Sequence, residues 1–130
     1  MNRPPRLALT QGDPAGIGPE ILLKLLRSQA ANVANAASPA WQPILVAERA
    51  ALEALRPVLA DFPWDRLRYV DSPDPATTAG DATDAEIPVL DPVRERRRLD
   101  LGRSGPADAF GAMAALDAGI ALVRSGAADA

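Results

Sequence analysis

The feature that most constrains this chain is a glycine-rich turn that separates an apolar run from an amphipathic one. Residues 7–10 are mostly apolar (Leu-Ala-Leu-Thr), residues 12–20 form the turn (Gly-Asp-Pro-Ala-Gly-Ile-Gly-Pro-Glu), and residues 21–26 are amphipathic. The three glycines of the turn allow backbone angles that a Cβ would forbid, and they let a ligand approach the main chain. Pro19 suits the first turn of a helix, where its missing N–H costs nothing. The pattern therefore predicts a strand, a tight turn and a helix.

The chemistry of this turn leaves three interpretations open. Free amide groups at a helix N-terminus favour a phosphate or carboxylate. Asp13 and Glu20 would repel an anion, and they suit hydroxyl, amide or ribose groups instead. The turn matches neither common nucleotide loop. A Walker loop ends in Gly-Lys-Ser/Thr, whereas Gly18 is followed by Pro19 and Glu20, and the glycine spacing is G-x-x-x-G-x-G rather than the G-x-G-x-x-G of dinucleotide-binding turns. A purely structural turn is the third interpretation.

Apolar periodicity predicts that strands and helices alternate along the rest of the chain. Strands are expected at residues 6–11, 43–47, 67–70 and 87–90, and helices at 19–32, 48–55 and 106–125. Pro57 is expected to bend or end the second helix because it cannot donate its backbone hydrogen bond. Residues 35–43 and 71–86 are expected to be connections. This alternation predicts an α/β fold with a mostly parallel sheet and right-handed crossovers.

Helical spacing also predicts which helix faces are buried. The stripe expected to be buried in the first helix is Leu22, Leu25, Leu26 and Val33, with an ion pair between Glu20 and Lys24 on the outer side. The stripe expected in the last helix is Phe110, Met113, Leu116, Ile120 and Val123. We interpret Phe110 and Met113 as core residues rather than ligand contacts. Gly111 and Gly119 each weaken that helix by roughly 1 kcal/mol, which indicates close packing against another backbone, such as a partner helix.

Charged residues outside the turn are weaker indications of a binding site than the turn itself. The run at residues 94–98 (Arg-Glu-Arg-Arg-Arg) suggests a phosphate or nucleic-acid site, but a solvated loop whose arginines meet acids such as Asp91 and Asp100 is favoured on an acidic chain. Arg103 has two interpretations, contact with an anionic group or neighbouring subunit, and a structural salt bridge. The carboxylates Asp81, Asp84 and Glu86 lie in an expected loop and are interpreted as solvated rather than as metal ligands.

Composition excludes several classes of protein. The chain has 130 residues, 48% of them hydrophobic and 24% charged, which is typical of a soluble globular domain. A net charge of −3 gives no electrostatic reason to expect nucleic acid or an anionic membrane as partner. Without cysteine, neither a disulfide nor a thiolate metal site can form. No signal-peptide core and no run of membrane-spanning length is recognised, so a cytoplasmic location is expected.

The turn and a second set of residues resemble one enzyme family. The string at 12–20, near the N-terminus, closely resembles that of the 4-hydroxythreonine-4-phosphate dehydrogenase family of vitamin B6 biosynthesis. With Pro14 and Ala15 skipped, it is also similar to the G-D-G-I-G-P-E opening of isopropylmalate and isocitrate dehydrogenases, which share the fold. The second set is Gly102, Arg103, Gly111, Ala112, Ala114, Ala115, Leu116, Ala118, Ala121, Gly126, Asp129 and Ala130. The resemblance implies an isocitrate/isopropylmalate dehydrogenase-like α/β fold, of which residues 1–130 form the N-terminal part, the first of two lobes, with the C-terminal remainder absent.

The resemblance also implies an activity, a cofactor and a metal. Family members oxidise 4-phosphooxy-threonine with NAD or NADP, with decarboxylation, in pyridoxal phosphate biosynthesis, and are cytoplasmic homodimers. On this basis Asp13, Gly16 and Gly18 are expected to bind the cofactor. A divalent metal such as zinc, magnesium or cobalt would be held by three histidines of downstream segments. This chain has no histidine, so neither metal ligands nor catalytic residues are expected within it, and alone it is expected to be inactive.

Two alternatives remain open at the level of sequence. One is a paralogue that acts on another hydroxy acid, such as an aldonate phosphate or a cis-dihydrodiol carboxylate, because these motifs do not select the substrate. The other is a non-catalytic α/β module that binds a phosphorylated ligand or dimerises with a related protein. In either case, an open sheet edge and uncovered apolar helix faces predict low stability or aggregation for the isolated chain.

Overall fold

Four parallel strands form a single sheet with the order β1-β2-β4-β3. The computed structural model describes residues 3–33, 40–72 and 86–130. The strands are β1 (Arg6–Thr10), β2 (Gln42–Val46), β3 (Leu67–Tyr69) and β4 (Ile87–Leu90). The predicted α/β class with a parallel sheet is confirmed, and each predicted strand begins and ends within one residue of its expected bounds.

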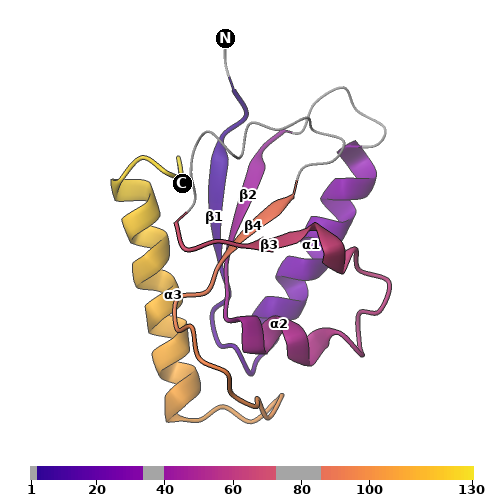
Figure 1. Cartoon of the computed structure of the whole chain (residues 1–130), viewed down its shortest axis with the longest axis vertical. Helices are drawn as coiled ribbons and strands as arrows, with labels where there is room; N and C mark the ends of the chain where they lie inside the picture. The colour runs from indigo at the N-terminus through magenta and orange to yellow at the C-terminus, as the bar shows by residue number, and fades with distance from the viewer. Residues whose placement is uncertain (1–2, 34–39, 73–85) are drawn as a thin grey trace.

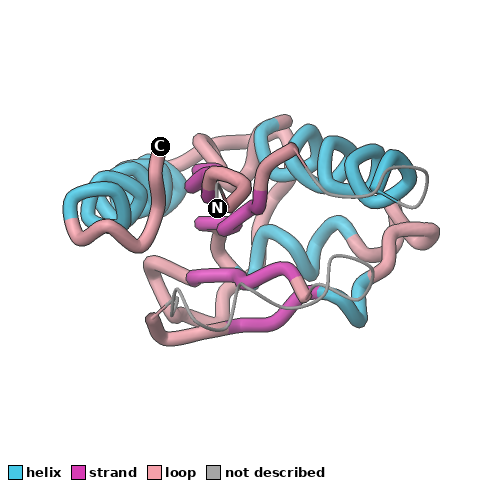
Figure 2. The backbone as a smooth tube through the Cα atoms, turned by 90° about the horizontal axis from the view of Figure 1, so that it is seen from above, coloured by secondary structure: helices cyan, strands magenta, loops and turns pink. Residues whose placement is uncertain are grey.

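Helices cover both faces of this sheet. Helices α1 (Gly18–Val33) and α2 (Arg49–Leu55) lie on one face, and α3 (Pro106–Arg124) lies on the other (Figure 1). The view from above in Figure 2 shows the same arrangement. All three helices were predicted, whereas the short 3₁₀ helix Trp64–Arg66 was not. Most residues of the expected connections at 35–43 and 71–86 lie outside the described residues.

Two apolar cores form because the central strand β2 is covered on both sides. Leu45 faces α1 and α2 and packs with Leu23, Leu26 and Leu52. Its neighbour Ile44 faces the other way, toward α3. Side chains alternate between the two faces of a strand, so a continuous apolar run fills both cores. The interpretation of residues 44–46 as a strand covered on both faces is thus confirmed.

The buried face of α1 differs in part from the predicted stripe. Leu26 is buried and Leu22 is partly buried, as expected, but Leu25 is 43% exposed, and Leu23 takes its place in the core. The expected ion pair is present, with Lys24 Nζ 2.7 Å from Glu20 Oε1. The side chain of Val33 lies outside the described residues.

The predicted orientation of α3 is wrong. The five large apolar side chains expected to be buried are all exposed: Phe110, Met113, Leu116, Ile120 and Val123. The residues that face the sheet are mostly small and lie at Gly111, Ala115, Gly119 and Leu122. A Cβ on Gly119 would come 2.8 Å from Cγ2 of Thr10 in β1, and a Cβ on Gly111 would overlap the Glu48 carboxylate. The close packing expected at the two glycines is confirmed, but the expected partner is wrong: both glycines pack against side chains of the same chain, not against another backbone.

The composition of α3 also corrects the statement that no run reaches membrane-spanning length. Over its 19 residues this helix is long and apolar enough to cross a membrane by length and composition alone. Its small-residue face packs on β1 and β2, as shown by Ala115 in the core with Ile44 and Val46. Core helices of α/β proteins meet the same length and composition criteria, so this finding is weak evidence for a membrane span.

Substitutions on the outer face of α3 should therefore affect association rather than folding. We expect the combined change Met113→Gln and Ile120→Gln to reduce self-association and to leave the free energy of unfolding within about 0.5 kcal/mol, because both side chains are exposed. Sedimentation velocity and urea unfolding would measure the two effects. Ala115→Gln, on the buried face, is the matched control and should destabilise the chain strongly. Monomeric behaviour of the unmodified chain with a sharp two-state melt would contradict the expectation.

The last residues of the chain lie along the outer edge of β1. The backbone N–H of Ala8 donates to the carbonyl of Ala130 over 2.7 Å, and the N–H of Asp129 donates to the carbonyl of Arg6 over 2.8 Å. The Asp129 carboxylate also binds the Arg3 guanidinium at 2.8 Å. The edge of the sheet next to α3 is thus partly paired by residues far away in sequence.

Candidate functional site

The glycine-rich turn lies at the carboxyl end of β1, the edge at which open α/β sheets bind their ligands. It begins with Gly12, whose φ of 67° is in the left-handed region that favours glycine. Pro14 and Ala15 are buried, whereas Ile17 is 68% exposed. The turn therefore has a buried inner side and one large apolar side chain in solvent, just before α1.

Asp13 and Gly16, two of the three predicted cofactor-binding residues, are engaged within the turn and its neighbouring loop. Asp13 Oδ1 accepts the backbone N–H of Ala15 over 2.9 Å, and Oδ2 accepts the hydroxyl of Ser104. The N–H of Gly16 donates to the carbonyl of Asp13 over 3.1 Å. The Asp13 carboxylate thus fixes the turn, and the Gly16 amide is already hydrogen-bonded.

Gly18, the third predicted residue, has a steric role that the structure makes clear. A Cβ at this position would overlap the carbonyl oxygen of Gln11 and lie 3.1 Å from its carbonyl carbon. Gly18 also begins α1, and the first N–H groups of a helix have no acceptor within it. Its amide therefore remains suited to an external acceptor, as the prediction requires.

Beneath the turn lies a buried polar cluster that begins with Gln11 and Glu48. Gln11 is 1% exposed and Glu48 is fully buried. The Gln11 side chain donates from Nε2 to Glu48 Oε1 over 3.3 Å, and its Oε1 accepts the backbone N–H of Glu48 over 2.9 Å. This exchange ties the carboxyl end of β1 to that of β2.

Arg97 completes the cluster by joining Glu48 to the start of α3. Its Nε donates to Glu48 Oε2 over 2.8 Å, and one terminal nitrogen donates to Asp108 Oδ1 over 2.7 Å. The hydrogen bonds that Arg97 donates to Glu48, and to a smaller extent to Asp108, raise the pKa of Arg97 above its ordinary value, although burial opposes the shift. We define Gln11, Glu48, Arg97 and Asp108 as the sub-turn cluster.

The sequence carries only a partial signal for this cluster. Gln11 and Glu48 each follow a short apolar strand closely, where side chains reach the carboxyl edge of a parallel sheet. The partner Arg97 lies within the basic run at 94–98, and spacing alone does not distinguish it from its neighbours. Only the fold brings residues 11, 48, 97 and 108 together.

Two further arginines, Arg94 and Arg103, form exposed ion pairs. Arg94 lies 3.4 Å from Asp71, and Arg103 lies 3.6 Å from Asp100, each pair being exposed. The interpretation of residues 94–98 as a solvated loop fits Arg94, which is exposed and pairs with Asp71. It is wrong for Arg97, which is largely buried and pairs with Glu48 and Asp108, and Asp91 is bound by backbone N–H groups rather than by an arginine side chain. For Arg103 the salt-bridge interpretation therefore fits.

Protonation of Asp108 should weaken the fold at low pH. The Arg97 guanidinium and the backbone N–H of Gly105 hold the pKa of Asp108 below its usual range. A carboxyl whose folded pKa is depressed stabilises the protein above its unfolded pKa, and that stability is lost as the pH falls through the folded pKa. We expect urea unfolding to show a loss of stability below about pH 4, with a shallower pH dependence in Asp108→Asn. Equal slopes for both proteins would contradict this role.

The family resemblance implies a dinucleotide cofactor and a divalent metal, and the described residues are compatible with the first but offer no ligand set for the second. For a dinucleotide, the turn offers an amide at the start of α1 and an exposed apolar side chain at Ile17, which is compatible with binding. For a divalent metal, no three histidine, cysteine or carboxylate side chains converge within residues 3–33, 40–72 and 86–130. Asp81 and Asp84 lie outside the described residues. The described residues thus do not supply a metal site.

Comparisons with known proteins find relatives that are named as phosphate-substrate dehydrogenases. The chain is 37% identical over 122 residues to a 4-hydroxythreonine-4-phosphate dehydrogenase of Chromobacterium violaceum, covering 92% of this chain and 31% of the relative. It is 38% identical over 73 residues to a provisionally named D-threonate 4-phosphate dehydrogenase of Halalkalibacterium halodurans, covering 55% of this chain and 20% of the relative. No family model matches the chain.

A solved structure shows the same fold. The crystal structure of a 4-hydroxythreonine-4-phosphate dehydrogenase from Burkholderia phymatum superposes with a TM-score of 0.69 at 20% identity, covering 98% of this chain and 35% of that one. The chain thus spans about a third of the length of the Chromobacterium relative and of this structure. Over the part that its sequence covers, the chain belongs to the 4-hydroxythreonine-4-phosphate dehydrogenase family.

Proposed function

We propose that this chain forms part of an NAD- or NADP-dependent dehydrogenase that oxidises 4-phosphooxy-threonine, with decarboxylation, in pyridoxal phosphate biosynthesis. The observation that carries the proposal is the 37% identity to the Chromobacterium relative over 92% of the chain. The position of the turn at 12–20 on the carboxyl edge of the sheet supports it, because this edge binds ligands in α/β folds.

In this proposal the turn contributes to a cofactor site. The chemistry that a bound dinucleotide would supply is acceptance of a hydride from the carbon that carries the substrate's secondary hydroxyl. The amide of Gly18 would donate a hydrogen bond to it, and Ile17 would give it an apolar contact. Asp13 holds the turn in shape through Ala15 and Ser104. Gly16 is proposed to lie beside the cofactor, with its amide held by the carbonyl of Asp13.

The remaining parts of the reaction fall to segments that this chain does not contain. The described residues offer no metal ligand set, so we assign no metal-dependent step to them. Substrate binding, proton transfer and metal binding belong to the other two thirds of the relatives' length. The complete enzyme is proposed to be a cytoplasmic homodimer.

A hybrid enzyme tests the proposal directly. The matching segment of the Chromobacterium violaceum relative is replaced by residues 1–130, and reduction of NAD is followed with 4-phosphooxy-threonine and a divalent metal. We expect the hybrid to turn over, and the 130-residue chain alone to give no turnover. Turnover by the isolated chain would contradict the proposal that its site is incomplete.

A point variant serves as the matched control for the hybrid. Asp13→Ala in the hybrid removes both side-chain hydrogen bonds that fix the turn, so we expect the KM for NAD to rise, with the substrate KM changing less. The proposal fails if the hybrid is folded, has the same oligomeric state as the parent and still lacks activity.

A separate observation supports a second candidate function. The similarity to a provisionally named D-threonate 4-phosphate dehydrogenase over 73 residues favours a paralogue that oxidises an aldonate phosphate. The native full-length protein, assayed with both phosphates, separates the candidates by their kcat/KM ratio.

A further inference from the structure

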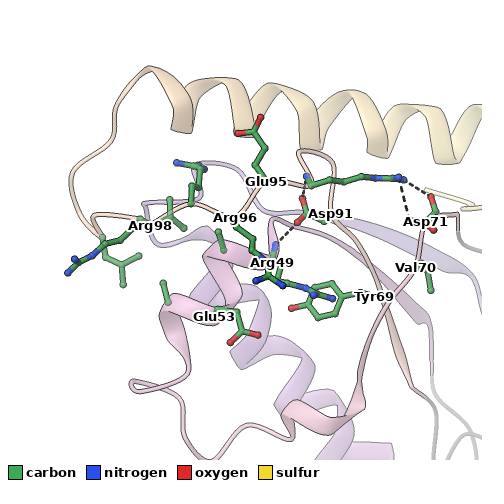
Figure 3. A pocket seen from close by; sticks show the side chains of 15 residues that line it. Arg49, Glu53, Tyr69, Val70, Asp71, Asp91, Glu95, Arg96 and Arg98 are labelled. Carbon is green, nitrogen blue, oxygen red and sulfur yellow. Dashed lines mark hydrogen bonds and ion pairs between the residues drawn. The ribbon is translucent and has the colours of Figure 1, made fainter.

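The segment that joins β4 to α3, residues 91–105, first lines an open cavity of about 1230 Å³ together with α2 (Figure 3). Asp91 fixes the start of this segment, because its carboxylate accepts the backbone N–H groups of Arg49 and Arg94 over 3.0 and 2.8 Å. Arg97 fixes the middle as a member of the sub-turn cluster. The residues that follow Arg97 are thus attached to an anchored segment.

Beyond the cavity, this segment contacts the glycine-rich turn through two residues. The N–H of Gly102 donates to the carbonyl of Ala15 over 2.7 Å, and the hydroxyl of Ser104 donates to Asp13 Oδ2. Ser104 and Asp13 are 91 positions apart in the sequence. Two long-range contacts therefore attach the turn to the segment that leads into α3.

The Asp13 carboxylate connects the contact inside the turn to the contact outside it. Its Oδ1 accepts the N–H of Ala15 over 2.9 Å, whereas its Oδ2 accepts the Ser104 hydroxyl. Ala15 is buried, so its N–H needs an acceptor within the protein. A carboxylate held at both oxygens keeps one orientation, and the Ser104 hydroxyl thus sets the direction in which Asp13 meets Ala15.

Ser104 is itself held in place, because the residue after it caps α3. The N–H of Gly105 donates to Asp108 Oδ2 over 2.8 Å, and Asp108 Oδ1 accepts Arg97 over 2.7 Å. Asp108 is buried, and its contacts join the start of α3 to the sub-turn cluster. The Ser104 hydroxyl is therefore presented to the turn from a rigid support, as the positioning of a ligand-binding group requires.

From these contacts we infer that Ser104 is a positioning residue for the proposed cofactor site. It acts through Asp13 rather than by contact with the ligand: its hydroxyl orients the carboxylate, and the carboxylate holds the turn that presents the Gly18 amide. The inference rests on the proposed function for the identity of the ligand, whereas the hold of Ser104 on the turn is a property of this chain. The competing interpretation is an exposed hydrogen bond without effect on binding.

The hybrid enzyme described above tests the inference by kinetics. In Ser104→Ala we expect the KM for NAD to rise about fivefold or more, with kcat within about twofold of the hybrid, because a misplaced turn weakens cofactor binding. Ser104→Thr keeps a hydroxyl and should hold the KM within about twofold of the hybrid. Ser125→Ala, the matched control, removes a hydroxyl that donates to the Leu122 carbonyl over 3.1 Å at the other end of α3, and should leave the KM unchanged.

A double variant shows whether Ser104 acts through Asp13. Asp13→Ala already removes the group that the hydroxyl holds, so adding Ser104→Ala should raise the KM by no more than about twofold further. If Ser104 acted independently of Asp13, the two effects would multiply.

Amide exchange separates this inference from the proposed function, because it needs no turnover. In Ser104→Ala, hydrogen–deuterium exchange at the N–H of Ala15 should be about tenfold faster than in the parent chain, whereas the amides of β2 should change less than about twofold. NMR measures this exchange in the 130-residue chain, and mass spectrometry measures it in the hybrid, so the test does not depend on the stability of the isolated chain.

Each outcome decides the inference. It is overturned if Ser104→Ala leaves the exchange at Ala15 unchanged, if the KM of an active hybrid does not rise, or if the effects of Asp13→Ala and Ser104→Ala multiply. It is also overturned if Ser125→Ala raises the KM as much as Ser104→Ala does. An inactive hybrid contradicts the proposed function, and the exchange at Ala15 alone then confirms or overturns the hold of Ser104 on the turn. Far-UV circular dichroism checks that the compared proteins are folded.

Discussion

Replacing Arg97 by methionine should lower the free energy of unfolding by about 3–5 kcal/mol, because the change leaves a buried carboxylate without its cation. Glu48 is fully buried, and Arg97 is the only cation within the described residues that contacts it. Without Arg97, the side-chain donor left to the Glu48 carboxylate among the described residues is the Gln11 amide at 3.3 Å. An unpaired buried charge is far more costly than the absence of the whole pair.

The measurement is urea unfolding of the 130-residue chain, followed by far-UV circular dichroism. If the chain is only marginally stable, the variant will be largely unfolded even without urea. The matched control is Arg96→Met, on the same loop, which should stay within about 0.5 kcal/mol because that side chain is exposed and makes no ion pair among the described residues. In the double variant Arg97→Met and Glu48→Met, the loss should be smaller than in Arg97→Met alone. An Arg97→Met protein as stable as the parent would show that the ion pair does not hold the fold.

Gly18→Ala should destabilise the chain by about 1–3 kcal/mol, although alanine favours helix over glycine. The added Cβ would overlap the carbonyl oxygen of Gln11, which is a backbone atom and cannot rotate away. Relief of the overlap requires β1 and α1 to move apart, and this would disturb Leu23 and Leu26 in the core. The penalty arises from backbone contact, so it does not depend on any ligand.

The control for Gly18 is another glycine at the start of a helix. Gly105 precedes α3, and a Cβ there would meet nothing nearer than Asp108 Oδ2 at 3.9 Å, which is an ordinary contact. Thermal unfolding should therefore show a clear decrease in Tm for Gly18→Ala and little change for Gly105→Ala. A Gly18→Ala protein with the Tm of the parent or higher would contradict the steric role.

The turn at 12–20 has a structural role that does not depend on a ligand. Gly18 is required by packing, Asp13 fixes the local loop, and Gly16 is hydrogen-bonded within the turn. Their contacts establish this role for all three residues, whereas cofactor binding by Asp13, Gly16 and Gly18 stays a prediction. The two roles are compatible, because a rigid turn presents the amide of Gly18 in a fixed direction.

The sequence predicted only the part of the candidate functional site whose residues are neighbours along the chain. The turn between β1 and α1 was recognisable because glycine and proline restrict the backbone directly, within a few residues. The sub-turn cluster joins residues 11, 48, 97 and 108, and the cavity joins α2 to a loop that follows two further strands. Contacts over such separations depend on strand order, and periodicity carries no information about that order.

By itself, the sequence determined where strands and helices begin and end, because hydrophobic period, glycine and proline act over a few residues. It also determined the α/β class, since strands that alternate with helices form parallel sheets. Only the tertiary structure decided which face of α3 meets the sheet. The stripe with Phe110 and Met113 has the larger apolar side chains, yet the face with Gly111 and Gly119 is buried, because only small side chains let the helix backbone come this close to Thr10 and Glu48.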